Sequence, residues 1–305
     1  MEERKTIYLC LAHMSETGEE QKYVKEAFDT NWVVPLGPNV NGFEDDLKAF
    51  VSKNSDGSEL SREVVALSAG TAAVHLGLLA SGVGPGDEVC VQSFTFCASS
   101  HPITYLGATP VFIDSEPDSW NMDPELLEKA IIDRKEKTGK YPKAIVPVAL
   151  YGMPYDCDKI MAISEKYGIP VVEDAAEGCG SRWKGQVLGT FGKFGVLSFN
   201  GNKMITTSGG GALICQDAES KNNVMWYATQ ARDAYPYYQH TAIGYNYRMS
   251  NVCAGIGRGQ MTVLEDHIAH HKHVQELYKE LLKDVEGVTL HEAPNADYDS
   301  NYWLC

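Results

Sequence analysis

From residue 63 onward the chain alternates short apolar runs with longer amphipathic stretches. The apolar runs have the length of strands, and the stretches between them repeat their apolar positions at helical spacing. Strands that are apolar throughout and separated by helices are typical of a parallel sheet covered on both faces. The predicted strands are residues 64–67, 88–91, 109–113, 144–149, 169–173, 195–199 and 211–215. The predicted helices between them are residues 71–80, 98–106, 124–132 and 156–167.

The two flanks of this α/β region follow different patterns. Residues 1–62 look like an arm that holds one helix, near 18–30, and then a turn-rich stretch at 34–38. Residues 250–284 repeat apolar positions at helical spacing and predict one long helix, either straight or kinked. Beyond Gly287 we expect a strand at 287–290, followed by an apolar, uncapped ending that resembles a strand cut short.

These patterns divide the chain into two predicted parts. Residues 1–250 would form the N-terminal arm and a large domain, and residues 251–305 the start of a smaller, incomplete C-terminal domain. The hydrophobic share of 44% suits a buried core of this size.

Charge and cysteine content exclude several classes of protein. The net charge of −15 argues against a general nucleic-acid-binding surface but leaves room for a local phosphate pocket. No apolar run approaches the roughly 20 residues of a membrane-spanning helix, and the charged N-terminus lacks a signal-peptide core. The eight cysteines are scattered without a Cys-x-x-Cys pair. A disulfide framework or zinc site is therefore not expected, and a cytoplasmic location is the simplest interpretation.

A lysine stands in a loop between two predicted strands. Lys203 follows Ser198 by five residues and precedes the glycine run 209–211. Burial disfavours the ammonium form of lysine, and the neutral amine is a nucleophile toward carbonyl groups. A solvated lysine in a surface loop is the common alternative, and this motif alone does not exclude it.

Two further strand ends carry candidate ligand groups. Asp174 ends an apolar strand, where α/β sheets bind ligands, and could hold a protonated ring nitrogen; a helix-capping role is equally compatible. Gly70 and Thr71 begin a helix after a strand, where free N–H groups attract phosphate; an ordinary βα turn is the alternative.

Aromatic and basic residues complete the set of candidates. Phe96 could stack on a flat ring or pack in the core, and core packing is the expectation for Phe94. Asn246 and Arg248 project to the same side of an extended segment and suit a phosphate or carboxylate; the start of a helix capped by Ser250 is the alternative.

The order of these pieces resembles the pyridoxal-phosphate (PLP)-dependent sugar aminotransferases of the DegT/DnrJ/StrS type. The resemblance runs almost from end to end. The motifs that carry it are Leu36-Gly-Pro-Asn-Val-Asn-Gly-Phe-Glu44, Ser68-Ala-Gly-Thr-Ala-Ala, Gly84-Pro-Gly-Asp-Glu-Val89, Gly107-Ala-Thr-Pro-Val-Phe-Ile-Asp114, Glu173-Asp-Ala-Ala, Ser198-Phe-Asn-Gly-Asn-Lys203 and Gly244-Tyr-Asn-Tyr-Arg-Met-Ser250.

The resemblance implies an aspartate-aminotransferase-like fold. It consists of a three-layer αβα large domain with a mostly parallel seven-stranded sheet and a smaller C-terminal α+β domain. Relatives extend well past Tyr302-Trp-Leu, so the resemblance implies that the small domain is truncated here.

The resemblance also implies a role for each candidate residue. Lys203 would be the catalytic residue, carrying PLP as a Schiff base and shuttling the proton. Asp174 would pair with the ring nitrogen, Phe96 would stack on the ring, and Glu177 would lie near the ring hydroxyl. The phosphate would be held by Gly70, Thr71 and Ser198, and Ala72 would also bind the cofactor. Asn246 and Arg248 would reach the active site of a neighbouring subunit, which implies a homodimer with shared sites.

The implied reaction moves an amino group from L-glutamate to a UDP- or dTDP-linked 4-keto-6-deoxy sugar, for polysaccharide or glycan synthesis. A non-catalytic regulator or truncated remnant is the alternative; the truncation favours it, whereas Lys203 and Asp174 disfavour it. The histidines 267, 270, 271 and 273 lack a completing carboxylate, so a solvated helix surface is expected there and not a metal site.

Overall fold

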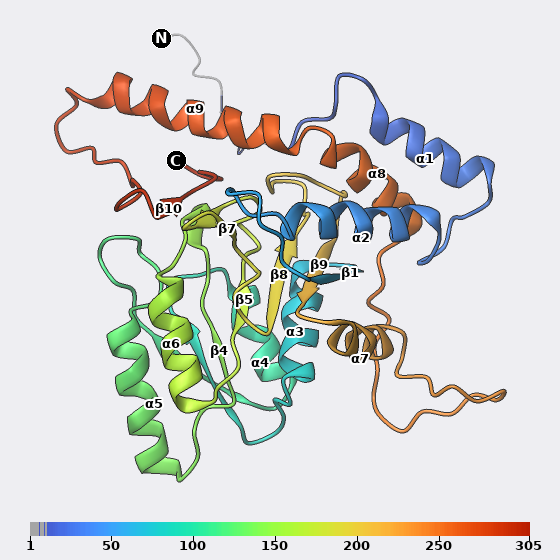
Figure 1. Cartoon of the computed structure of the whole chain (residues 1–305), viewed down its shortest axis with the longest axis horizontal. Helices are drawn as coiled ribbons and strands as arrows, with labels where there is room; N and C mark the ends of the chain where they lie inside the picture. Colours follow the sequence, from blue (N-terminus) through green and yellow to red (C-terminus); the bar gives the residue numbers. More distant parts are fainter. Residues whose placement is uncertain (1–5, 7–8, 10) are drawn as a thin grey trace.

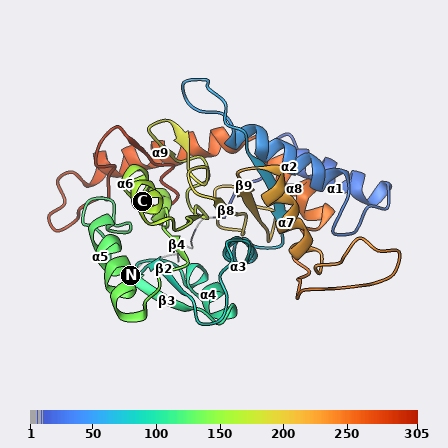
Figure 2. The same cartoon turned by 60° about the horizontal axis from the view of Figure 1, so that its bottom comes forward.

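A sheet of short, buried strands forms the centre of the structure, a computed structural model that describes residues 6, 9 and 11–305. All the strands predicted between residues 63 and 215 are present (Figures 1 and 2). They are β1 Glu63–Leu67, β2 Glu88–Gln92, β3 Thr109–Ile113, β4 Ala144–Val146, β5 Val172–Asp174, β8 Phe194–Ser198 and β9 Gly211–Cys215.

The strands pair mostly in parallel. β3, β2 and β4 form one parallel sheet, and β5 pairs in parallel with β8 in a second sheet with β9 and β1. Isolated parallel bridges, Ile145 with Val171 and Val148 with Asp174, connect the two sheets. The order is thus β3-β2-β4-β5-β8-β9-β1, in which β9 runs antiparallel to both neighbours. The carboxyl ends of β5 and β8 therefore lie side by side.

Each face of the sheet carries its own buried cluster, because successive strand residues point to opposite faces. Val64 and Ala66 belong to a cluster with α2 Pro38–Val51, α5 Pro124–Thr138 and α6 Cys157–Tyr167. Val65 and Leu67 belong to a second cluster with α3 Gly70–Ala80, α4 His101–Tyr105 and α7 Ala218–Ala228. Figure 2 shows α2 and α3 on opposite sides of β8 and β9. The sheet is therefore covered on both faces, as the pattern predicted.

The N-terminal part holds one helix more than predicted. α1 Glu19–Asp29 matches the expected helix near 18–30, but α2 follows it directly after the turn-rich stretch. The interpretation of Pro38 as a turn residue was wrong, because Pro38 occupies the first turn of α2. A missing backbone N–H costs nothing at that position.

The expected long helix over 250–284 is also corrected. The structure has two helices, α8 Asn251–Met261 and α9 Leu264–Leu282. The N–H groups of Thr262 and Val263 bond three residues back, and this tightening ends α8 just before these two β-branched residues. Ser250 caps α8, as one alternative proposed. The glycines of α8 let it pack closely on α1 and α2, since a Cβ at Gly257 would lie 2.7 Å from Phe43.

No strand forms at residues 287–290, so that prediction was wrong. Gly287 has a φ of 79° and lies in a turn. The chain instead forms β10 Tyr298–Asp299, which pairs with β6 Arg182–Trp183 beside β7 Gln186–Val187. The predicted division of the chain at residue 250 stays a prediction. Among the helices that the structure describes, none is long and apolar enough to cross a membrane.

Candidate active site

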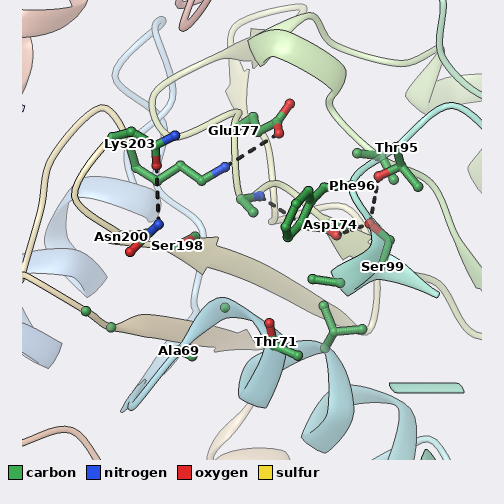
Figure 3. A pocket seen from close by; sticks show the side chains of 18 of the residues that line it. Ala69, Thr71, Thr95, Phe96, Ser99, Asp174, Glu177, Ser198, Asn200 and Lys203 are labelled. Carbon is green, nitrogen blue, oxygen red and sulfur yellow. Dashed lines mark hydrogen bonds and ion pairs between the residues drawn. The ribbon is translucent and has the colours of Figure 1, made fainter. Parts of the chain in front are cut away.

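A cavity of about 270 Å³ lies where the carboxyl ends of β5 and β8 meet the start of α3 (Figure 3). Open α/β sheets bind ligands beyond the carboxyl ends of their strands. Separate stretches of the chain build the wall, and most of the predicted site residues meet there. Those that line the cavity are Gly70, Thr71, Phe96, Asp174, Glu177, Ser198 and Lys203.

The first turn of α3 forms one end of the cavity. Its N-cap residue, Ala69, offers no side-chain hydrogen bond to the free N–H groups of that turn. Such N–H groups and the helix dipole attract anions. A Cβ at Gly70 would lie 3.0 Å from the Cβ of Ser198, so glycine allows the close approach of the two segments. Thr71 and Ser198 add hydroxyl groups, whereas Ala72 belongs to the turn without lining the cavity.

Asp174 ends β5, and its carboxylate is buried in the cavity wall. Ser99 Oγ donates to Oδ2 at 2.6 Å, and the Ala176 N–H donates to Oδ1 at 3.2 Å. Burial raises the pKa of Asp174, and these hydrogen bonds and the charge of Lys203 oppose that rise only in part. The helix-capping alternative is wrong, because no helix follows β5 directly. A cationic ligand group would stabilise this carboxylate.

The aromatic residues after β2 do not pack in the core. Phe96 precedes the 3-10 turn η1 Cys97–Ser99, lines the cavity and is 70% exposed. Phe94, for which we expected core packing, is also exposed; its ring centroid lies 6.4 Å from that of Trp120 and 6.2 Å from that of Tyr151. The Phe96 ring can therefore contact a ligand in the cavity.

Lys203 lies in the loop between β8 and β9, and its side chain is only 14% exposed. The Nζ atom lies 3.5 Å from Oε1 of Glu177 and 4.2 Å from the centroid of the Trp303 ring. Figure 3 shows the Lys203 and Glu177 side chains pointing toward each other. The alternative of a solvated surface lysine is therefore wrong.

Glu177 is fixed from its other side by backbone. The Tyr151 N–H donates to Oε2 at 2.7 Å, from a residue whose φ of 54° is uncommon for a non-glycine residue. Burial raises the pKa of Glu177, while the nearby Lys203 opposes the rise. The cavity thus brings the amine of Lys203 near two largely shielded carboxylates, those of Glu177 and Asp174.

Asn246 and Arg248 are not brought to this cavity within one chain. They line a separate hollow beside the loop that follows α7. Arg248 Nη1 lies 2.6 Å from Oε1 of Glu44 and donates to the carbonyl of Ala66 at 2.9 Å. Asn246 is exposed. The guanidinium is therefore already paired, whereas the amide is open to a partner.

Several residues of the cavity wall are not among the predicted site residues. Ser99 and Thr95 lie behind Asp174, and Trp303 faces Lys203 from the other end of the chain. The hydroxyl side chains of Thr95 and Ser99, close to Phe96 in the sequence, were a weak signal that these two residues belong to the site. No local pattern places Trp303, since its Nε1–H donates at 2.6 Å to the carbonyl of Asn202, far away in sequence.

Two histidines of α9 are partly buried and contact backbone carbonyls, and the other two are exposed. Nδ1 of His267 lies 3.0 Å from the carbonyl of Met204, and Nδ1 of His271 lies 3.1 Å from that of Tyr302. His270 and His273 are exposed. Within residues 6, 9 and 11–305, no group of His, Cys, Asp and Glu side chains is arranged to hold a metal ion.

Comparison with known proteins places this geometry in a family. The sequence profile of the DegT/DnrJ/EryC1/StrS aminotransferase family matches residues 14–305. EpsN of Bacillus subtilis, which carries the name of a pyridoxal phosphate-dependent aminotransferase, is 46% identical over 98% of this chain and 74% of its own length. GDP-perosamine synthase of Escherichia coli O157:H7 is 35% identical over 97% of this chain and 77% of its own length.

A solved structure is similar over the same span. It is that of a DegT DnrJ EryC1 StrS aminotransferase from Brucella abortus, with a TM-score of 0.85 and 31% identity. The match covers 94% of this chain and 74% of that one.

Proposed function

The chain belongs to the DegT/DnrJ/EryC1/StrS aminotransferase family, and we propose that it moves an amino group from L-glutamate to a keto-sugar linked to a nucleotide. It is a PLP-dependent sugar aminotransferase. The observation that carries the proposal is that Lys203, Asp174 and the uncapped first turn of α3 converge on one cavity. A phosphate, a ring nitrogen and an aldehyde would each find a matching group there.

The cavity fits PLP group by group. The turn that begins α3 suits its phosphate, the buried carboxylate suits a protonated ring nitrogen, and the exposed phenylalanine suits a ring face. Bound PLP supplies an electron-poor ring that withdraws electrons from the carbon bearing the amino group. The residues proposed to hold it are Gly70, Thr71, Ala72, Phe96, Asp174, Glu177, Ser198 and Lys203.

Lys203 would hold and move a proton at Nζ. Amino transfer requires that a proton leave one carbon and reach another, and an amine close to both can carry it. Glu177 Oε1, 3.5 Å from Nζ, would stabilise the ammonium form each time Lys203 takes up the proton. Asp174 would meanwhile hold the proton of the ring nitrogen through its carboxylate. Each residue thus handles one proton at a separate atom.

The acceptor sugar is the finer part of the proposal. We propose a 4-keto-6-deoxyhexose linked to UDP or dTDP, whose amino product serves polysaccharide or glycan synthesis. The E. coli relative is named for a GDP-linked sugar, so GDP belongs in any test of the nucleotide. The glutamate donor is proposed from the resemblance of the whole chain to sugar aminotransferases.

A homodimer with shared sites is proposed as the working form. The amide of Asn246 is exposed and lies away from the cavity of its own chain. Beside it, a loop between α7 and α8 extends from the body of the molecule (Figure 1), and Tyr238 and Ile243 on that loop are exposed. Such a surface suits a second copy of the chain, whose cavity Asn246 would complete.

The proposal is tested by amino transfer in solution. The PLP-loaded protein is mixed with L-glutamate and a 4-keto-6-deoxyhexose linked to UDP, dTDP or GDP, and mass spectrometry follows 2-oxoglutarate and the amino sugar. We expect both products with at least one nucleotide and neither with Lys203→Ala. Bound PLP without turnover on any sugar would contradict the substrate assignment and favour a non-catalytic role.

A further inference from the structure

Two hydroxyl groups stand in line behind the carboxylate of Asp174 (Figure 3). Ser99 Oγ donates to Oδ2 of Asp174 at 2.6 Å, and Thr95 Oγ1 lies 2.8 Å from Ser99 Oγ. Ser99 is 1% exposed and Asp174 is 5% exposed. Water therefore competes little for these bonds, and each is stronger than it would be at the surface.

The single hydroxyl proton of Ser99 sets the direction of this chain of hydrogen bonds. Because Ser99 donates that proton to Asp174, its oxygen can only accept from Thr95, whose hydroxyl then donates. The Ser99 N–H also donates to the carbonyl of Phe96 at 3.1 Å within η1. The same short turn that presents Phe96 to the cavity thus fixes the position of Ser99.

Charges around Asp174 act in opposite directions. Lys203, from the loop after β8, favours the carboxylate form, whereas Glu177, from the loop after β5, disfavours a second negative charge nearby. The remaining donor, the Ala176 N–H, lies 3.2 Å from Oδ1. Ser99 makes the shorter of the two hydrogen bonds and is the only side-chain donor that the structure records for this carboxylate within the described residues.

From this geometry we infer that Ser99, oriented by Thr95, is a positioning residue that holds Asp174 in its carboxylate form. The inference rests on the proposed function, in which Asp174 faces the ring nitrogen of PLP. An ionised Asp174 keeps a proton on that nitrogen and so keeps the ring electron-poor. A hydroxyl group that does not itself touch the cofactor thereby sets how strongly the ring withdraws electrons.

The deciding measurement is the proton affinity of Asp174 in the cofactor-free protein. Carboxyl-13C aspartate labelling with NMR titration gives this affinity, and Asp174→Asn identifies the resonance. Ser99→Ala should raise the proton affinity about tenfold, because a buried carboxylate loses a charge-assisted hydrogen bond. Thr95→Val should shift it less, in the same direction. Ser99→Thr keeps the hydroxyl and should restore the wild-type titration, and the neighbouring Ser100→Ala should not change it.

An unchanged titration of Asp174 in a folded Ser99→Ala protein, checked by circular dichroism, would overturn the inference. If that variant does not fold, Thr95→Val decides the matter in the same way. The visible absorption of the PLP-loaded protein is read separately: in Ser99→Ala the shared proton should shift from the ring nitrogen toward the more basic Asp174, so a smaller fraction of the ring should absorb as the protonated form. A shift in the cofactor-free protein with no change in the loaded spectrum would instead overturn the assignment of Asp174 to the ring nitrogen.

Discussion

Oε1 of Glu177 lies 3.5 Å from Nζ of Lys203, with both side chains largely shielded from water. Charges interact more strongly in such a place than at the surface. The Tyr151 N–H holds the other oxygen of Glu177, so the carboxylate is fixed with respect to the amine. Glu177 is therefore placed to favour Lys203 as an ammonium group whenever the lysine takes up a proton.

Replacing Glu177 by glutamine tests this relationship. Glu177→Gln keeps the shape and an oxygen for the Tyr151 N–H but removes the charge. We expect kcat/KM for amino transfer to fall by about tenfold, the effect of losing roughly 1.4 kcal/mol of transition-state stabilisation. The matched control is Glu128→Gln, which alters a partly exposed carboxylate on α5 that pairs with Lys166. Equal rates for the two variants would contradict the role given to Glu177.

The ionised carboxylate of Asp174 should lower the free energy of unfolding of the cofactor-free protein at neutral pH. Its pKa is raised by burial, so the folded protein binds a proton more readily than the unfolded chain. Stability is therefore lost as the pH rises from about 4, the ordinary range of an aspartate, through the raised pKa. Asp174→Asn should be more stable than wild type at about pH 7, and this gain should shrink toward about pH 4.

Thermal unfolding at several pH values measures this effect. The control is Asp158→Asn, because Lys184 and Trp183 lower the pKa of Asp158 and the sign reverses. That variant should lose stability at neutral pH. A stability difference for Asp174→Asn that does not depend on pH would show that the carboxylate is not the cause.

Gly70 should be required for the phosphate end of the cavity. In Gly70→Ala the new methyl group would lie 3.0 Å from the Cβ of Ser198 and push the first turn of α3 away. We expect the Kd for PLP, from absorbance titration, to rise by at least about tenfold. Gly84→Ala is the control, since no atom lies within 4 Å of its Cβ position. The same Kd for both variants would mean that α3 does not bind the phosphate.

Subunit complementation tests the shared site. Lys203→Ala and Asn246→Ala should each be nearly inactive alone. In mixed dimers, one site combines Lys203 of one chain with Asn246 of the other and is intact. Random mixing should restore about a quarter of the wild-type activity. No recovery on mixing, with dimers confirmed by ultracentrifugation, would place Asn246 outside the partner's site.

The fold could be predicted wherever local pattern decides it. Apolar runs located every strand of the main sheet, because a strand buried on both faces has no polar side. The prediction of one long helix over 250–284 was wrong because the spacing of apolar residues does not reveal where backbone hydrogen bonds shift to a partner three residues back. This shift occurs at Thr262 and Val263. α2 was missed because Pro38 suits a turn and the first turn of a helix equally well.

The candidate site, too, could be predicted only in part from the sequence. Gly70, Asp174 and Lys203 follow strand ends, and parallel topology brings strand ends together. The position of Ser99 depends on a 3-10 turn, which the spacing of apolar residues does not predict. Trp303 contacts Lys203 although the two residues lie far apart in the sequence. The spacing of Asn246 and Arg248 suggested an anion site, but the placement of Asn246 in a neighbouring subunit came only from the family resemblance.

The central claim is that Lys203 holds the cofactor covalently. The measurement is borohydride reduction of the PLP-loaded protein, followed by peptide mass spectrometry, on wild type, Lys203→Ala and Lys193→Ala, a lysine outside the cavity. We predict a single pyridoxyl-modified peptide containing Lys203 in wild type and in Lys193→Ala, and none in Lys203→Ala. Modification of another lysine in wild type, or undiminished labelling of Lys203→Ala, would contradict the account.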